Sequence, residues 1–228
     1  MVGRNELLNT HPSRAMPSDS LAGDSPFLFI GDTLALDLVN TEQIVRGQRR
    51  DLLATPDSLA LWWQAAQHHH PSVAEVQDAG VAITVDAAAL SAAKSLRAAL
   101  RGIFGAIVDA ASINPSQITI LNAVLRTGAR ALALISGGDV TPVYQILPGE
   151  APMLFAVALS AVELLRGGDR QRLHRCGNDR CVLLFYDTTK SATRRWCSVG
   201  CMDRARSFRR YQAAKQHGHP AEADSPSE

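Results

Sequence analysis

The spacing of apolar residues changes along the chain, and the spacing before residue 54 predicts strands. Leucines alternate with other residues over 33–41, after an apolar run at 27–30, and this pattern predicts two strands. Residues 44–53 are expected to form a hairpin around Gly47. Helical spacing replaces alternation after this hairpin.

Four helices are predicted by apolar residues three and four positions apart, together with start signals. They begin at Thr55-Pro56-Asp57, at Asp86 (to about 111), at Asn114-Pro115 (to about 127) and near 150 (to about 165). Residues 131–135 and 140–147 flank a Gly-Gly-Asp turn and predict a second hairpin. A few strands among packed helices indicate an α+β fold.

Composition suggests where the folded part begins and ends. Residues 1–25 are polar and rich in Ser and Pro, and we expect them to be disordered, as we do 216–228. Gly167-Gly168 ends the last predicted helix and predicts a domain boundary, with one domain at 26–168 and a second at 169–215. No secretory leader and no long apolar stretch is evident, which favours a cytoplasmic protein without a membrane span.

All four cysteines of the chain fall near its C-terminus, as Cys176-x4-Cys181-x15-Cys197-x3-Cys201. Two close pairs around a short loop are typical of a four-thiolate zinc site. The rival interpretation is two disulfides, which a cytoplasmic chain of 228 residues with 46% hydrophobic content does not need. Iron and iron–sulfur clusters also accept four thiolates and stay open as alternatives.

The spacing also predicts how the metal is held. Cys176 and Cys181 bracket a tight turn, an apolar segment follows, and Ser198 is placed to cap a helix whose first turn contains Cys201. A knuckle, a hairpin and a helix that begins at the last ligands make a treble-clef-like finger. Because four protein ligands close the zinc site and no nucleophile motif is present, we do not expect an enzyme.

Charge is distributed unevenly along the chain. Residues 171–215 hold eleven Lys and Arg against three acids, a net charge of +8, so the rest of the chain carries −7 of the total of +1. A helical projection of the predicted last helix places Arg206, Arg209 and Arg210 away from the metal. An arginine face without compensating acids favours DNA as partner. The predicted contact residues are Arg194, Arg195, Arg204, Arg206, Arg209 and Arg210. The alternative is a solvated basic surface without a partner.

The first domain offers weaker candidates. Asp37 and Asn40 are polar residues within an apolar segment and are candidates for a small-ligand pocket; equally, they satisfy local backbone groups while Trp62-Trp63 fill the core. Basic residues at 94, 97 and 101 share one face of the long helix, where we expect a solvated stripe rather than an anion site.

Several stretches of sequence resemble one family. Residues 176–188 (CGNDRCVLLFYDT), 194–198 (RRWCS) and 201–205 (CMDRA) are similar to the bacterial CGNR zinc-finger proteins. Residues 36–41 (LDLVNT) and 51–60 (DLLATPDSLA) resemble the opening strand and following helix of the ABATE domain that precedes this finger. At the last cysteine this chain reads Cys-Met-Asp-Arg, so the family's Gly and Asn are replaced there.

The resemblance implies a DNA-binding regulator of transcription with an N-terminal domain for sensing or dimerisation. The sequence therefore predicts a zinc-dependent regulator that contacts DNA through a zinc-held basic helix, with a small ligand and a homodimer as further expectations. Two alternatives stay open: a protein-interaction module whose zinc finger is only structural, and a metabolite-binding protein or enzyme that acts through its N-terminal domain.

Overall fold

The computed structural model describes residues 26–70, 84–134, 137–148 and 150–217. The helices are α1 (Leu34–Val39), α2 (Pro56–His69), α4 (Ala87–Val108), α5 (Pro115–Leu125), α6 (Pro152–Gly167), the short 3-10 helix η2 (Arg170–Arg172) and α7 (Val199–His217). The strands form three antiparallel hairpins: β1 (Glu42–Val45) with β2 (Gln48–Asp51), β3 (Gly128–Leu134) with β4 (Val140–Ile146), and β5 (Leu173–Arg175) with β6 (Leu184–Tyr186). The fold is α+β, as predicted.

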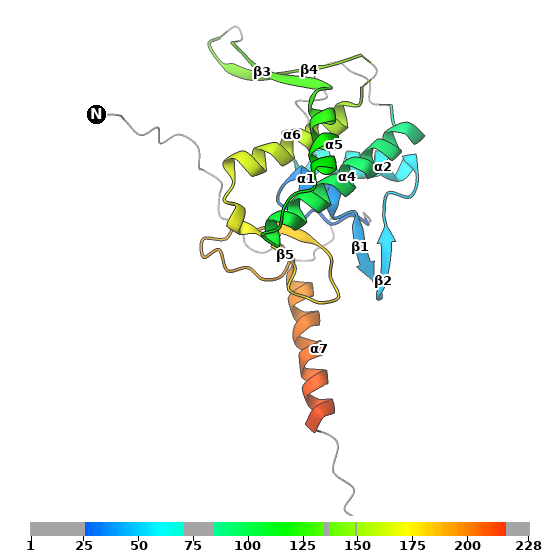
Figure 1. Cartoon of the computed structure of the whole chain (residues 1–228), viewed down its shortest axis with the longest axis vertical. Helices are drawn as coiled ribbons and strands as arrows, with labels where there is room; N and C mark the ends of the chain where they lie inside the picture. Colours follow the sequence, from blue (N-terminus) through cyan, green and yellow to red (C-terminus); the bar gives the residue numbers. More distant parts are fainter. Residues whose placement is uncertain (1–25, 71–83, 135–136, 149, 218–228) are drawn as a thin grey trace, which may run out of the picture.

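Helix α1 lies at the centre of the molecule, packed against α4 and α6 (Figure 1). Here the sequence prediction was wrong: the segment 33–41 contains the short helix α1 instead of a strand, and 27–30 is not a strand. All six residues of α1 are buried. The residues between its leucines are therefore not solvent-facing, and the alternation of leucines does not indicate a strand with one exposed face. Thr33 caps the helix, because its side-chain oxygen accepts the N–H of Leu36.

The main core surrounds α1 and is built from the inner faces of the long helices. Its largest fully buried side chains include Trp62, Leu96, Leu100, Phe104 and Met153. The predicted helix starts are confirmed at Thr55, Asp86 and Asn114, each of which caps its helix through a side-chain oxygen. The adjacent Trp62 and Trp63 fill the core and do not line a ligand pocket, which was one of the two interpretations of the sequence.

An ion-pair network around the buried Arg97 joins the predicted hairpin β1–β2 to α4. Arg97, with a side chain only 4% exposed, donates to both carboxylate oxygens of Asp51 at 2.6 and 2.9 Å, and it lies 3.3 Å from Glu42. Arg101 Nε lies 2.9 Å from the same glutamate. The expected solvated basic stripe is therefore wrong for Arg97 and Arg101, whose charges are paired with the two acids at the base of the hairpin.

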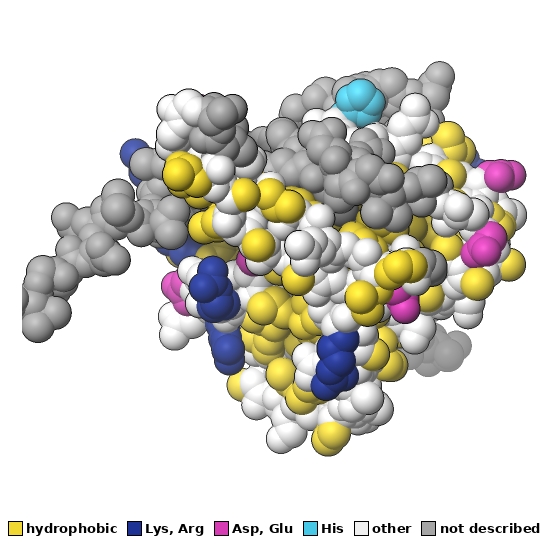
Figure 2. Space-filling model, turned by 90° about the horizontal axis from the view of Figure 1, so that it is seen from above, with side chains coloured by type: hydrophobic (Ala, Val, Ile, Leu, Met, Phe, Trp, Pro, Cys, Tyr) yellow, Lys and Arg dark blue, Asp and Glu magenta, His cyan; other side chains and the backbone are white. Residues whose placement is uncertain are grey.

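The hairpin β3–β4 projects from the body at the end opposite α7 (Figure 1). Its root packs on the core through Tyr144 and Ile146, but its outer part exposes apolar side chains, among them Leu132 (71% exposed) and Leu134 (73%). Hydrophobic side chains gather on the face seen from this end (Figure 2). Within the described residues this sheet has two strands and no third.

The zinc-finger half packs directly on the first half. A second cluster of buried residues joins Ile30 to Leu183, Phe185 and three of the cysteines. The boundary near residue 168 stays a prediction. The two ends expected to be disordered, 1–25 and 216–228, lie outside the described residues except that α7 continues to His217.

Substitution of Asp51 by Asn should destabilise the fold by about 2 to 3 kcal/mol, because it leaves the buried Arg97 cation undercompensated. Replacement of Lys94 by Ala, which removes a half-exposed partner of the same carboxylate, should cost less than about 1 kcal/mol. Chemical denaturation of both variants tests this, and equal small effects would contradict it.

The same carboxyl predicts the direction of the pH dependence. Burial raises the pKa of Asp51, but hydrogen bonds from Arg97 and from the Leu53 N–H outweigh burial and lower it to about 2. Because this pKa lies below its unfolded value, the ionised carboxylate stabilises the fold above about pH 4, and that stabilisation is lost as the pH falls toward 2.

Candidate zinc centre and nucleic-acid interface

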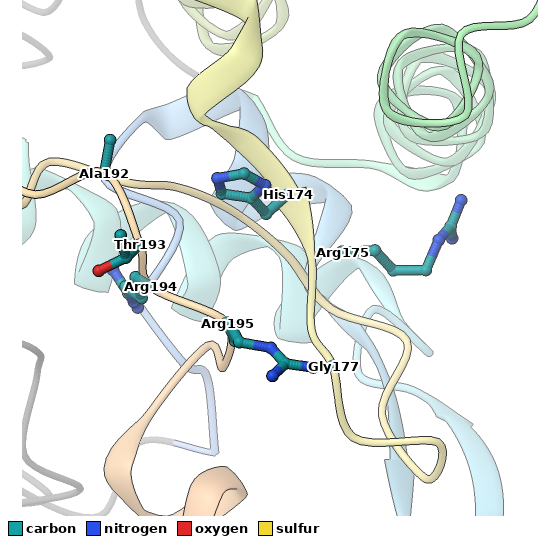
Figure 3. A pocket seen from close by; sticks show the side chains of 7 residues that line it. All are labelled: His174, Arg175, Gly177, Ala192, Thr193, Arg194 and Arg195. Carbon is teal, nitrogen blue, oxygen red and sulfur yellow. The ribbon is translucent and has the colours of Figure 1, made fainter.

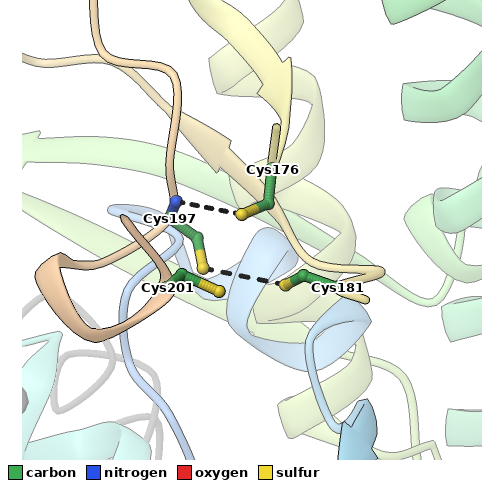
Figure 4. Close-up of side chains that lie close together, drawn as sticks. All are labelled: Cys176, Cys181, Cys197 and Cys201. Atoms are coloured by element: carbon green, nitrogen blue, oxygen red, sulfur yellow. Dashed lines mark hydrogen bonds between the residues drawn. The ribbon is translucent and has the colours of Figure 1, made fainter. Parts of the chain in front are cut away.

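The four cysteines converge on one point from two segments of chain (Figure 4). Cys176 and Cys181 bracket the turn between β5 and β6, whereas Cys197 and Cys201 lie at the start of α7. Their four sulfurs are all within 4.8 Å of one another, and the sulfurs of Cys181 and Cys197 are 3.8 Å apart. Zn–S bonds of about 2.3 Å in a tetrahedron place sulfurs about 3.8 Å apart, so the cluster fits a four-thiolate zinc ion.

Hydrogen-bond donors approach the sulfurs of Cys176 and Cys201 and favour the ionised form of these two thiols. The N–H of Cys197 points at Cys176 Sγ (3.4 Å), and Asn178 and Arg204 approach Cys201 Sγ at 3.6 and 3.3 Å. A hydrogen bond from Cys181 also holds the pKa of Cys176 below its usual range. Sequence reasoning missed the contacts that Asn178 and Arg204 make with this sulfur; their closeness to cysteines in the sequence was the only available hint.

Helix α7 begins where the metal ligands end. Ser198 Oγ accepts the N–H of Cys201 at 3.2 Å and its carbonyl accepts the N–H of Met202, so the predicted cap is confirmed. The first turn is thereby fixed to the zinc centre. A zinc ion bound here supplies a rigid cross-link between the knuckle and the helix.

Arg194 holds the finger against the body instead of facing solvent. Its side chain is 2% exposed, forms an ion pair with Asp32 at 3.3 Å, and donates to the carbonyls of Trp196 and Cys197. The guanidinium also lies 4.4 Å from the centre of the Phe185 ring. The prediction that Arg194 contacts DNA was therefore wrong, because its donors are already engaged inside the protein.

Asp187 organises the loop that carries Arg194. Its carboxylate accepts the N–H groups of Thr189 and Arg194 at 2.9 and 2.8 Å and the Thr189 hydroxyl at 2.6 Å. Burial raises the pKa of Asp187, but these hydrogen bonds outweigh burial and lower it. The ionised carboxylate therefore stabilises the loop between the two cysteine pairs.

The remaining predicted contact residues lie on the outside of the finger. Arg195, Arg204, Arg206, Arg209 and Arg210 are all exposed, and α7 projects from the body as a single helix (Figure 1). Every side chain from 209 to 215 is exposed. On the opposite side, Phe208 is covered by Arg180, whose guanidinium lies 4.3 Å from the ring centre. The helix thus presents basic residues to solvent and does not fold back on the acidic body.

Within the described residues, Asp37 and Asn40 do not line a ligand pocket, so this prediction was wrong. Asp37 accepts the Gly31 N–H at 2.7 Å, and His70 Nε2 lies 2.7 Å from its other oxygen. Asn40 donates to the carbonyl of Leu184 (2.8 Å) and accepts its N–H (3.0 Å). Both side chains are buried and hydrogen-bonded, as the second interpretation expected, but His70 and Leu184 are distant partners and not local backbone groups.

A cavity of about 290 Å³ lies within the finger instead (Figure 3). It is lined by His174, Arg175, Gly177 and residues 192–195. Arg195 extends toward Gly177, whereas Arg175 points away and binds Asp109 at 3.0 Å. The cavity has a basic rim, and neither Asp37 nor Asn40 belongs to it.

Fold and site together define a four-cysteine zinc finger packed on an α+β domain. Comparison with protein families matches residues 32–168 to ABATE, described as "Putative stress-induced transcription regulator", and residues 172–215 to the CGNR zinc finger. The chain belongs to the ABATE family and carries the CGNR finger that the sequence motifs predicted. A comparison with curated proteins gives no match. In the described parts, no helix has the length and apolar character needed to span a bilayer.

Replacement of Cys201 by Ser should lower zinc affinity by more than about a hundredfold, because it removes a ligand as well as the sulfur that Asn178 and Arg204 contact. The thermal transition of the whole chain should also move to lower temperature, since the finger packs on the core. Metal analysis and circular dichroism measure both effects.

Ser198→Ala is the matched control for that variant. It removes the cap of the same helical turn and should cost about 1 kcal/mol without changing zinc stoichiometry. A Cys201→Ser protein that keeps its zinc and its unfolding temperature would contradict the assignment of the metal centre.

Proposed function

We propose that this protein is a zinc-dependent DNA-binding regulator of transcription in which α7 contacts the DNA backbone. The observation that carries the proposal is the helix itself, which leaves the zinc centre and exposes Arg206, Arg209, Arg210 and Lys215 with Asp203 as its one acid. A helix of 19 residues is about 28 Å long, enough to cross the groove of a duplex.

The energetics of α7 also favour a partner. An isolated helix in water is marginal, and most helical stability in proteins comes from packing of an apolar face. Beyond Phe208 this helix has no buried side chain among those described, so zinc and the cap support its start while its outer turns lack packing. Contacts with a polyanion would stabilise those turns, and arginine suits phosphate geometry.

The distribution of charge supports DNA over an acidic protein or a purely structural role. The finger segment carries +8 whereas the remainder carries −7, so a duplex is attracted to one end of the molecule. In the described residues no ion pair engages Arg206, Arg209 or Arg210. Their charge is therefore available to phosphates.

The measurement is binding of the zinc-loaded protein to a mixed-sequence duplex at several salt concentrations. If about five basic residues contact phosphates, log K should fall against log salt with a slope of roughly −4 to −5. The triple variant Arg206→Ala, Arg209→Ala, Arg210→Ala should reduce the slope by about 2 to 3.

A control with the same change in charge removes exposed arginines elsewhere, by Arg126→Ala, Arg166→Ala and Arg170→Ala. This control should bind as the intact protein does. Equal losses in both triple variants would indicate a general charge effect, and a zinc-loaded protein that does not bind the duplex would overturn the proposal.

We also infer that β3–β4 is a surface for self-association, because its exposed leucines lack cover among the described residues. Strand β4 contains Pro142, which lacks an N–H donor, so β3 is the edge better able to pair with a second copy. Arg130, its one charged residue, is already paired with Glu163.

Analytical ultracentrifugation tests the self-association. Leu132→Lys places a charge on the exposed edge and should shift the protein toward monomer, whereas Leu61→Lys, at an exposed leucine of α2, should not. A monomeric intact protein would contradict this inference.

A further inference from the structure

The tip of hairpin β1–β2 carries a concentration of positive charge that the zinc finger does not account for. Three of the five residues at 46–50 are arginines, Arg46, Arg49 and Arg50, and all five residues are exposed. We call this segment the arginine tip. It lies in the part of the chain whose net charge is −7, so it is a local exception to the acidic character of that part.

The backbone of the arginine tip is a tight two-residue turn. Val45 pairs with Gln48, and the two residues between them, Arg46 and Gly47, both have left-handed φ angles of 52° and 78°. Paired left-handed residues are typical of a type I′ turn, whose twist matches that of the flanking strands. The tip is therefore a defined structure and not a loose loop.

The acids nearest to the tip are already occupied. Glu42 and Asp51 form the cross-strand pair at the base of the hairpin, and both bind cations of α4. Among the described residues no ion pair is formed by the three arginines of the tip. The network at the base thus neutralises the only acids of the hairpin and leaves the charge of the tip unbalanced.

The same network ties the hairpin to the zinc finger. Arg101 Nε lies 2.9 Å from Glu42, while its Nη1 donates to the carbonyl of Val182, between the first cysteine pair and β6, at 3.1 Å. The hairpin base, α4 and the finger are therefore joined through one side chain. In Figure 1 the hairpin points toward the same end of the molecule as α7.

We propose that the arginine tip is a second DNA contact, which binds phosphates of the duplex beside the segment that α7 occupies. This proposal rests on the proposed function. The ligand is the sugar–phosphate backbone, since three exposed guanidinium groups at a tight turn suit phosphate oxygens and an exposed turn has no pocket for a base. The N-terminal domain would then contribute to DNA affinity directly, and the bound duplex would lie across both halves of the chain.

The test uses the full zinc-loaded protein and a mixed-sequence duplex of roughly 20 bp, about two helical turns. The variant Arg46→Ala, Arg49→Ala, Arg50→Ala should weaken binding and reduce the magnitude of the salt slope by about 2 to 3. Replacement of the same three residues by Lys should restore most of the slope, because lysine keeps the charge. The control at 126, 166 and 170 should leave the slope unchanged.

Each outcome separates this proposal from the proposed function. If the α7 variant loses the slope while the tip variant binds as the intact protein does, the arginine tip is not a contact and the function stands. If the intact protein does not bind the duplex, both are overturned. Thermal melts of the alanine and lysine variants identify misfolding, and binding that lysine does not restore in a folded protein would overturn the charge-based contact.

Discussion

The C-terminal part of this chain depends on one constraint, the convergence of four thiolates on a zinc ion. Strands β5 and β6 have three residues each, too few to fold alone. Coordination joins their turn to the start of α7, and the free energy of metal binding becomes free energy of folding. The sulfurs therefore have a structural role. They fix the direction of α7, a helix whose stability would be marginal in isolation.

Buried polar contacts then fix the finger relative to the body. Asn40 of the first domain pairs with both backbone groups of Leu184, Arg194 of the finger pairs with Asp32, and Arg101 donates to Val182. Such contacts are directional, and a side chain left without its partner in a buried site is costly. The finger is thus held in one orientation, so α7 and the arginine tip keep a fixed spatial relation.

The sequence was most informative where function depends on short-range spacing. The cysteine pattern identified all four sulfurs of the cluster, and Ser198 was recognised as a cap because a cap is set by neighbours within one turn. Helix α1 was mistaken for a strand because a segment buried on every side shows no period. Asp37 and Asn40 were noticed as unusual, but His70 and Leu184, their partners, lie 33 and 144 positions away and could not be inferred from local pattern.

The arginines show the same limit. Arg194 and Arg195 are adjacent and chemically identical, yet one is buried against Phe185 and the other is exposed. In the sequence, Arg97 and Arg101 likewise look like part of a solvated stripe. In the structure, the hairpin β1–β2 covers them and pairs with their charges. Whether a charged residue is buried depends on which acids from distant segments pair with it. Such long-range pairs cannot be inferred from the local pattern of a single sequence.

We propose that zinc holds α7 so that the basic face of the helix, together with the arginine tip, meets DNA. Amide chemical-shift mapping of the isotope-labelled, zinc-loaded chain with a mixed-sequence duplex tests it most directly. Chemical-shift changes are expected mainly in residues 206–215 and 46–50, and they should be lost when zinc is removed. Changes concentrated on β3–β4 or on the far side of the body, or no changes at all, would contradict it.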